Sequence, residues 1–204
     1  FSKGKAHDHL RGTPYDLDDA ELTRRVAEAW ARGATEVCLQ GGIHPAYTGQ
    51  KYLDVCRLVK EAAPRMHIHA FSPLEVWQGA KTLGLPLGDF IAKLREAGLA
   101  TLPGTAAEIL HDEVRAVLCP DKINSAQWLE VMEAAHSQGV RTTATMMYGH
   151  IEQPRHQADP REVLDRLHLV VRGHHARAAR HGAVIGQQHP VVRLDVLAHR
   201  FGQF

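Results

Sequence analysis

The 204-residue chain contains 44% hydrophobic and 23% charged residues, which is ordinary for a soluble globular protein. Its 24 Lys and Arg residues nearly balance its 23 Asp and Glu residues, so charge gives no reason to expect nucleic acid or an anionic membrane as a partner. No apolar run approaches the ~20 residues that span a bilayer, and the first residues do not form a secretion signal. We therefore expect a cytoplasmic protein.

Apolar residues at helical spacing predict helices over residues 16–32, 52–63, 74–83, 87–97 and 125–138. Short β-rich runs alternate with these helices, over residues 36–40, 66–71, 100–102 and 140–148. In the last of the helices, Ser125 is the predicted N-cap, and the predicted buried face consists of Trp128, Val131, Met132 and Ala135.

This alternation predicts an α/β fold with a parallel sheet, either open or closed into a barrel. Four predicted strands are too few for a full eight-stranded barrel. In such folds the functional groups gather in the loops at the carboxyl ends of the strands, which here read "QGGIHP", "FSPLE", "LPGTAAE" and "YGHIE".

The last 32 residues, from Gly173, break the alternation and hold five of the 15 histidines. A His-rich metal tract is one interpretation. A disordered end or a sequence artefact, such as a reading-frame slip, is the other. We therefore divide the chain into a core over residues 1–172 and a divergent tail over residues 173–204.

The cysteines Cys38, Cys56 and Cys119 lie too far apart for a disulfide framework or a zinc knuckle. Cysteines of this kind are typically small buried hydrophobic residues in a reducing compartment. None of the three is predicted to bind a metal.

Gly41 and Gly42 follow the first predicted strand. Two residues without side chains let backbone N–H groups approach a ligand that carries a carboxylate. A tight turn with no ligand also accounts for the pair.

His67 and His69 lie two residues apart in the second predicted strand, so both imidazoles face the same side. Such a pair is typical of metal-dependent hydrolases, and a metal set here is completed by His44, Glu75 and His150. The alternative is a pair of core histidines with backbone hydrogen bonds. Helix initiation accounts equally well for Glu75.

Thr105 and Glu108 are suited to binding a sugar hydroxyl, but their spacing also fits a capping box at a helix start. The loop from Gly149 to Glu152 is suited to closing round a flat ring. A polar turn is again the alternative.

Six stretches resemble, in order, a single family: "FSKGK", "EVCLQGGIHPAYTG", "HIHAFSPLEVWQGA", "LPGTAAEILHDEVRAVLCPDKI", "WLEVMEAAH" and "RTTATMMYGHIE". It is the FO synthase family of radical S-adenosylmethionine (SAM) enzymes, which make the deazaflavin precursor of coenzyme F420. The resemblance runs from Phe1 to about Arg166. Radical SAM enzymes of the futalosine pathway to menaquinone share part of these motifs and remain an alternative.

The resemblance implies a partial (β/α)6 radical SAM barrel, with SAM and a [4Fe-4S] cluster at the carboxyl ends of the strands. The family holds its cluster with three cysteines in a C-x3-C-x2-C loop, and "FSKGK" resembles the residues that directly follow this loop. We therefore expect the cluster cysteines upstream of Phe1 and no metal ligand in this chain. The barrel is expected to be truncated at its first strand and cluster loop, and to lack its last strand. Such a fragment is expected to be inactive on its own.

Residue by residue, the resemblance implies contacts with SAM in three loops, which meet its methionine end, its ribose and its adenine. The matching residues are Gln40, Gly41 and Gly42 for the first loop, Thr105 and Glu108 for the second, and Gly149 and Glu152 for the third. The residues that the resemblance implies along the substrate site are His44, His67, His69, Ser72 and Glu75.

The implied reaction joins the 4-hydroxybenzyl part of tyrosine to 5-amino-6-(D-ribitylamino)uracil, after a radical derived from SAM has taken a hydrogen atom from tyrosine. The implied partner is the companion radical SAM half of FO synthase, fused or separate. Two alternatives from other classes remain, a zinc-dependent barrel hydrolase that uses His67 and His69, and an inactive fragment.

Overall fold

The computed structural model describes residues 17–41, 43, 46–105, 107–146, 151–153, 155–156 and 194–196. The chain divides into two compact units, Phe1–Pro103 and Gly104–Phe204. Four of the candidate site residues lie outside the described residues: Gly42, His44, Gly149 and His150. The division at residue 172 stays a prediction.

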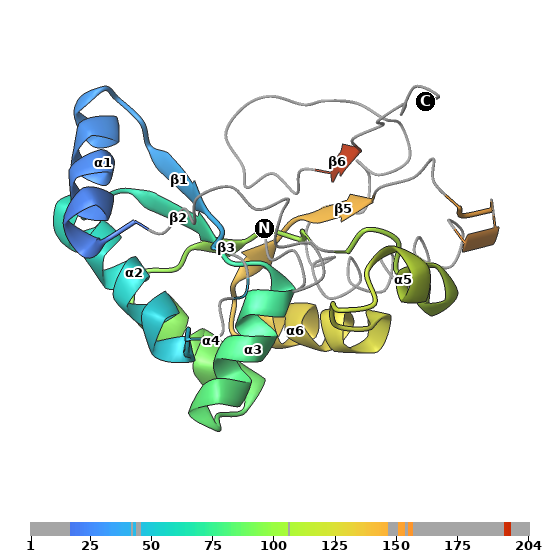
Figure 1. Cartoon of the computed structure of the whole chain (residues 1–204). Helices are drawn as coiled ribbons and strands as arrows, with labels where there is room; N and C mark the ends of the chain where they lie inside the picture. The colour runs from blue at the N-terminus through green and yellow to red at the C-terminus, as the bar shows by residue number, and fades with distance from the viewer. Residues whose placement is uncertain are drawn as a thin grey trace. The chain divides into compact units, whose positions relative to one another are not determined.

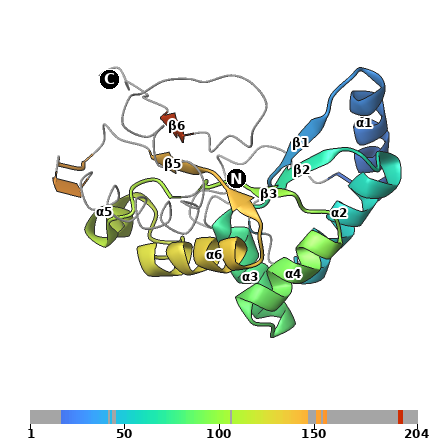
Figure 2. The same cartoon turned by 180° about the vertical axis from the view of Figure 1, so that it is seen from behind.

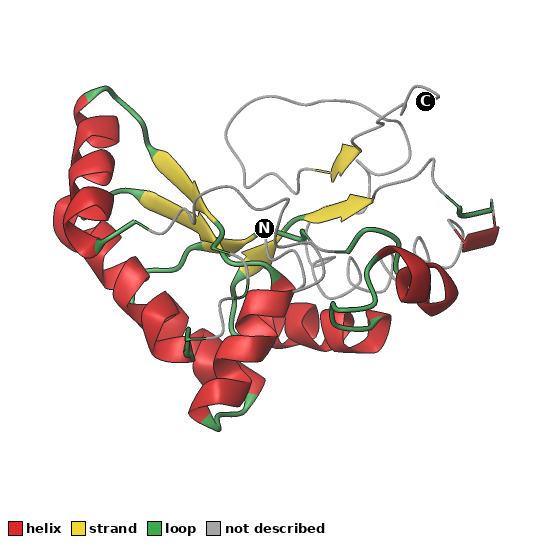
Figure 3. Ribbon diagram, viewed as in Figure 1, coloured by secondary structure: helices red, strands yellow, loops and turns green. Residues whose placement is uncertain are grey.

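The first unit alternates helices and strands, as Figure 3 shows. Its elements are α1 (Asp19–Ala31), β1 (Glu36–Leu39), α2 (Gly49–Ala62), β2 (His67–Ala70), α3 (Pro73–Leu83), α4 (Leu87–Glu96) and β3 (Thr101–Leu102). Its strands run in the order β1-β2-β3 and are parallel, with Cys38 opposite His69 and His69 opposite Thr101. The predicted parallel α/β arrangement is confirmed.

Helices α1 to α4 lie on one side of these strands (Figure 1). In β2, Ile68 and Ala70 are completely buried, whereas His67 and His69 point to the other face and are partly exposed. Because side chains alternate along a strand, one face of the sheet is apolar and covered and the other carries the polar groups.

The second unit contains α5 (Asp112–Leu118), α6 (Ser125–Ser137), β4 (Arg141–Thr142), β5 (Ala144–Met146) and β6 (Leu194–Val196). Figure 2 shows α6 from behind. The predicted buried face of α6 is confirmed, since Trp128, Val131, Met132 and Ala135 are completely buried.

The N-cap of α6 is Asn124, not the predicted Ser125. The Asn124 side chain accepts a hydrogen bond from the N–H of Gln127, and the Gln127 side chain accepts one from the N–H of Asn124. Ser125 instead donates its hydroxyl to Asp112. Asn and Ser are both favoured N-cap residues, so the prediction was one residue too far along the chain.

The strand predicted over residues 140–148 is divided at Thr143 into β4 and β5. The Thr143 hydroxyl accepts the N–H of Gly104 at 2.9 Å, so this residue bonds across to the loop that follows β3. β5 pairs in parallel with β6, which lies in the tail where no strand was expected. With three residues, β6 is too short to show a period-two pattern. No helix in the described part of the chain is both long and apolar enough to cross a membrane.

Candidate functional site

The loops after β1 and β2 are joined by the buried carboxylate of Glu75, which is 1% exposed. Its Oε1 accepts the N–H of Gly41 at 2.8 Å, and its Oε2 accepts both the N–H and the hydroxyl of Ser72, each at 2.8 Å. The Ser72 hydroxyl in turn accepts the N–H of Glu75, which completes a capping box at the start of α3. Glu75 therefore initiates α3, which was one of the alternatives for it, and also bonds to the glycine turn.

Gly41 is exposed, and a Cβ added to it would lie 3.7 Å from Glu75 Oε1 and 3.9 Å from the Tyr47 ring. These are ordinary van der Waals distances, so the packing of the chain itself does not require glycine at this position. The N–H of Gly41 is donated to Glu75 Oε1, so it is already engaged within the chain and does not point to a ligand carboxylate, as the sequence had suggested it could.

Phe71, directly after β2, has a φ of +63°, in the left-handed region that bulky residues rarely adopt. It is 3% exposed, its ring lies 4.9 Å from the ring of Tyr52, and its N–H donates to the Leu39 carbonyl. A conformation of this kind costs about 1–3 kcal/mol and persists where the surrounding packing enforces it. Pattern reasoning missed Phe71, because periodicity carries no information about a single backbone angle.

The polar face of the sheet carries His67, His69 and Thr101 side by side. The Thr101 hydroxyl lies 2.8 Å from His67 Nε2 and 2.7 Å from His69 Nδ1. Glu36 Oε2 lies 3.6 Å from His67 Nε2. Burial lowers the pKa of His69, and the charge of His67 adds to this effect, whereas Glu36 opposes it.

This geometry disfavours the zinc-hydrolase alternative. Both imidazoles direct a nitrogen at the hydroxyl of Thr101, which is where a metal held by the pair would have to lie.

In the second unit, Glu108 has a φ of +47°, and its carboxylate accepts a hydrogen bond from Lys122 Nζ. The carbonyl of Thr105 accepts the indole N–H of Trp128 at 3.2 Å. The capping-box alternative for Thr105 and Glu108 is wrong, because the next helix, α5, begins only at Asp112. The strained backbone of Glu108 and its ion pair fix this carboxylate in one position.

The loop that carries Glu108 is held by Arg115 of α5, which is 4% exposed. Its guanidinium donates to the carbonyls of Ala107, Ile109 and Ile123. The sequence analysis missed both α5 and this arginine. The visible signal was a single cation inside the short apolar run "VRAVL".

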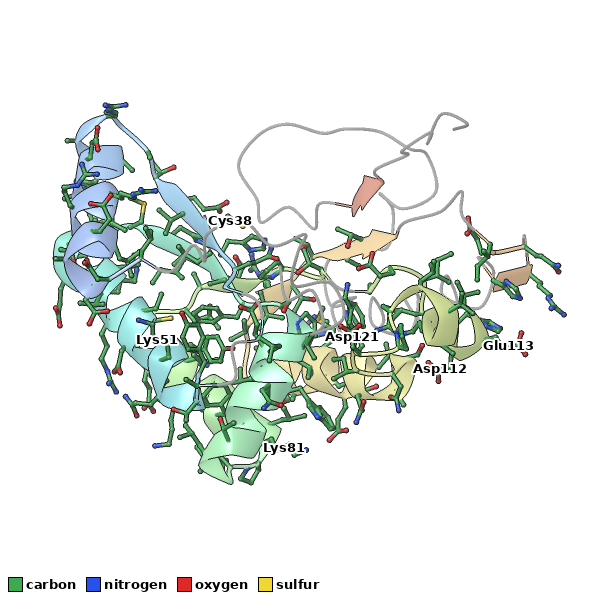
Figure 4. All side chains as sticks on the ribbon, in the orientation of Figure 1. Cys38, Lys51, Lys81, Asp112, Glu113 and Asp121 are labelled. Atoms are coloured by element: carbon green, nitrogen blue, oxygen red, sulfur yellow. The ribbon has the colours of Figure 1, made fainter. Side chains whose placement is uncertain are left out.

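Within the described residues, one group of three potential metal ligands has its ligand atoms within 4.8 Å of one another: His111, Glu113 and His156. Arg155 Nε lies 3.0 Å from His156 Nε2, and Arg155 Nη2 lies 3.9 Å from the Glu113 carboxylate. Because a guanidinium is always charged, it repels a cation at this position. We therefore assign no metal to this group, part of which Figure 4 shows at the labelled Glu113.

A surface cavity of about 860 Å³ lies over α2 and α4 and is lined by residues that include Leu53, Arg57, Lys60 and Lys93. None of the predicted site residues lines it. It lies among the helices, away from the carboxyl ends of the strands, so it does not mark the predicted site.

Residues 2–164 match the model of the Radical SAM superfamily. This chain belongs to the radical SAM superfamily. The family resemblance predicted from the motifs is thereby confirmed, together with the α/β fold that it implies.

Among the relatives of this radical SAM chain, the FO synthase of Streptomyces coelicolor is 52% identical over 142 residues, which are 70% of this chain and 16% of that protein. The 5-amino-6-(D-ribitylamino)uracil–L-tyrosine 4-hydroxyphenyl transferase of Methanothermobacter thermautotrophicus is 44% identical over 160 residues, 78% of this chain and 44% of the relative. The FO synthase of Mycobacterium leprae is 48% identical over 150 residues, 74% and 17% of the respective chains. The chain thus spans less than half the length of each of these relatives.

Radical SAM enzymes use an iron-sulfur cluster, and the cysteines of this chain do not fit one. Cys56 is completely enclosed in the core and Cys119 is 5% exposed, which leaves no room for a cluster at either. Burial raises the pKa of Cys56 to about 12 and also raises the pKa of Cys119, whereas Cys38 is exposed but a single cysteine cannot hold a cluster. A cluster ligand must be a thiolate, and these environments favour the thiol.

The predicted SAM residues fall into both units, with Gln40 and Gly41 in the first and Thr105, Glu108 and Glu152 in the second. Gln40 is exposed, and Thr105, Glu108 and Glu152 are half-buried. Their joint contact with SAM stays a prediction.

Proposed function

We propose that this chain forms part of a radical SAM enzyme that joins the 4-hydroxybenzyl part of tyrosine to 5-amino-6-(D-ribitylamino)uracil. The observation that carries the proposal is the 44–52% identity to relatives that bear the names FO synthase and tyrosine 4-hydroxyphenyl transferase. These names favour the deazaflavin pathway over the futalosine alternative. A cytoplasmic location and a companion radical SAM half as partner belong to the same proposal.

SAM is the proposed cofactor of the strand-end loops, where it supplies the chemistry of hydrogen-atom abstraction. The chain's own part is to bind and orient. Gln40, Gly41 and Gly42 are proposed to hold the methionine end, and the exposure of Gln40 and Gly41 supports this assignment. Thr105 and Glu108 are proposed to contact the ribose, and Gly149 and Glu152 the adenine. The residues proposed to line the substrate site are His44, His67, His69, Ser72 and Glu75.

The activity is tested in a chimera, because the cysteines of this chain do not fit a cluster. The 142 matched residues of the Streptomyces coelicolor FO synthase are replaced by those of this chain. We expect the chimera, assayed anaerobically with a reductant, to form FO from tyrosine and the ribitylaminouracil. A chimera that assembles its clusters but forms no FO would contradict the proposal.

The residue assignment is tested by Gly41→Ala in the same chimera. Since an added Cβ meets no atom of the described residues beyond its chain neighbours closer than 3.7 Å, the variant should fold with unchanged stability. We expect the KM for SAM to rise about 10-fold, because the methyl group displaces the ligand by about one carbon atom. Lys81→Ala, on the exposed side of α3 (Figure 4), is the control and should leave this KM unchanged. An unchanged KM in Gly41→Ala would place SAM elsewhere.

A further inference from the structure

We propose that His67, Thr101 and His69 form a directed proton-conducting chain across the sheet, and that Glu36 sets its direction. The three side chains come from β2 and β3 and share the polar face opposite the helices. We propose that this proton-conducting path exchanges protons with bound substrate, and this part of the proposal rests on the proposed function.

The direction follows from the donors and acceptors along the chain. The negative charge of Glu36 Oε2, 3.6 Å from His67 Nε2, electrostatically favours a proton on that nitrogen. That N–H then donates to the Thr101 hydroxyl at 2.8 Å. The single hydroxyl proton of Thr101 is left for His69 Nδ1 at 2.7 Å.

His69 Nδ1 must therefore be unprotonated, and neutral His69 carries its proton on Nε2. Burial disfavours the charged imidazolium of His69, which is consistent with a neutral ring. The half-buried His69 directs Nδ1 at Thr101, so its Nε2–H is the end of the chain that remains for a ligand.

One proton passes along the chain without a change in its total charge. A substrate base, such as a phenolate or an amine, takes the proton from His69 Nε2. The Thr101 hydroxyl proton moves to His69 Nδ1, the His67 Nε2 proton moves to Thr101, and His67 Nδ1 takes a proton from water at the partly exposed end. Every hydrogen bond then points the other way, and Glu36 favours the return to the starting direction.

Two-bond ¹H–¹⁵N correlation spectra of the histidine rings in the 204-residue chain test the proposal directly. We expect His69 with the proton on Nε2 and the lone pair on Nδ1. Thr101→Val removes the hydroxyl at nearly constant shape and should convert His69 to a mixture of tautomers, whereas Thr101→Ser should preserve the wild-type signals. His69 protonated on Nδ1 in the wild type, or unchanged by Thr101→Val, would overturn the proposal.

A second pair of variants provides the control and guards against misfolding of Thr101→Val. His136 and Thr142 form a matched pair in the other unit, with Nε2 and the hydroxyl 2.9 Å apart. Thr142→Val should change the signals of His136 and leave those of His69 as they are. Glu36→Gln leaves His67, Thr101 and His69 intact but removes the negative charge beside His67. It should therefore shift both His67 and His69 toward mixed tautomers. Unchanged signals of His67 and His69 in Glu36→Gln would also overturn the proposal.

The proposed exchange of protons between this path and bound substrate is measured in the chimera described above. Thr101→Val should lower kcat about 10²-fold relative to Thr101→Ser, with the KM for tyrosine unchanged, since general acid–base groups contribute about 10²–10⁴-fold. Equal kcat values for the two variants would contradict this use. If the parent chimera forms no FO, the proposed function fails. The NMR spectra of the histidine rings then still decide whether the proton-conducting path through His67, Thr101 and His69 exists.

Discussion

Glu75 is the residue whose position explains most about the predicted site. Its carboxylate is buried, and it accepts hydrogen bonds from Gly41 and Ser72, which follow the ends of two neighbouring strands. A buried carboxylate of this kind is stable because each oxygen is satisfied by donors. Its proposed place beside the substrate is therefore indirect, through the shape of the two loops.

Glu75→Gln should lower the free energy of unfolding by about 2 kcal/mol, because the amide replaces one acceptor oxygen with a donor that faces an N–H group. Urea unfolding followed by circular dichroism measures the change. Glu61→Gln on α2 is the matched control, since Glu61 is exposed and its substitution should change stability by less than about 0.5 kcal/mol. Equal effects of the two substitutions would show that Glu75 holds nothing together.

His69 should titrate below the ordinary histidine pKa of about 6.5, because burial disfavours its charged form. Above this pH the folded and unfolded states both hold His69 neutral. As the pH falls below it, the unfolded state binds the proton first, so stability is lost down to the folded-state pKa. Between about pH 7 and pH 5 the wild type should therefore lose more stability than His69→Asn. A larger loss in the variant would mean that the pKa of His69 is raised rather than lowered on folding. The neighbouring charges that would then have to account for the shift are Glu36 and His67.

At the scale of elements, Gly104 joins the loop after β3 to the run from β4 to β5. A Cβ on Gly104 would lie 1.8 Å from the Thr143 carbonyl oxygen and 2.6 Å from the Ala144 Cα, both of them backbone atoms. The Gly104 carbonyl also accepts the hydroxyl of Thr145 at 3.0 Å. Glycine is therefore required at this position by close packing, in contrast to Gly41.

Gly104→Ala should destabilise the chain by about 3 kcal/mol, at the upper end of the usual cost of overpacking, because the backbone cannot yield as a side chain can. Thermal unfolding compares it with Gly41→Ala, in which the same methyl group lies at ordinary van der Waals distances from Glu75 and Tyr47. If Gly104→Ala were as stable as Gly41→Ala, the contact between Gly104 and Thr143 would not exist in solution.

The helices with long apolar stripes were predicted from the sequence to within a few residues, because burial of a stripe is a local and periodic property. The errors lie where a tertiary contact decides. Asn124 is the N-cap of α6 in place of Ser125, whose hydroxyl donates a hydrogen bond to Asp112. Arg115 is buried by three carbonyls that no periodicity reveals. The spacing of Thr105 and Glu108 suggested a helix start, but Glu108 has a left-handed backbone conformation, which is not helical.

At the scale of the whole molecule, the family could be predicted because its motifs occur in order along the chain, and the superfamily match together with the FO synthase relatives confirms it. The assembly of the SAM site could not be predicted in the same way. Its proposed residues lie in two compact units, so their meeting depends on packing over the whole chain. Pattern reasoning gives which loops carry polar groups, but not the distances between them.

The central claim is that this radical SAM chain serves the tyrosine-dependent step of FO formation. The most direct measurement is SAM cleavage by the chimera with tyrosine, with a futalosine-type substrate and with neither. We predict cleavage that tyrosine stimulates at least about 10-fold, as expected when correct substrate completes the catalytic arrangement. Stimulation by the futalosine-type substrate alone, or equal cleavage in all three mixtures, would contradict the account.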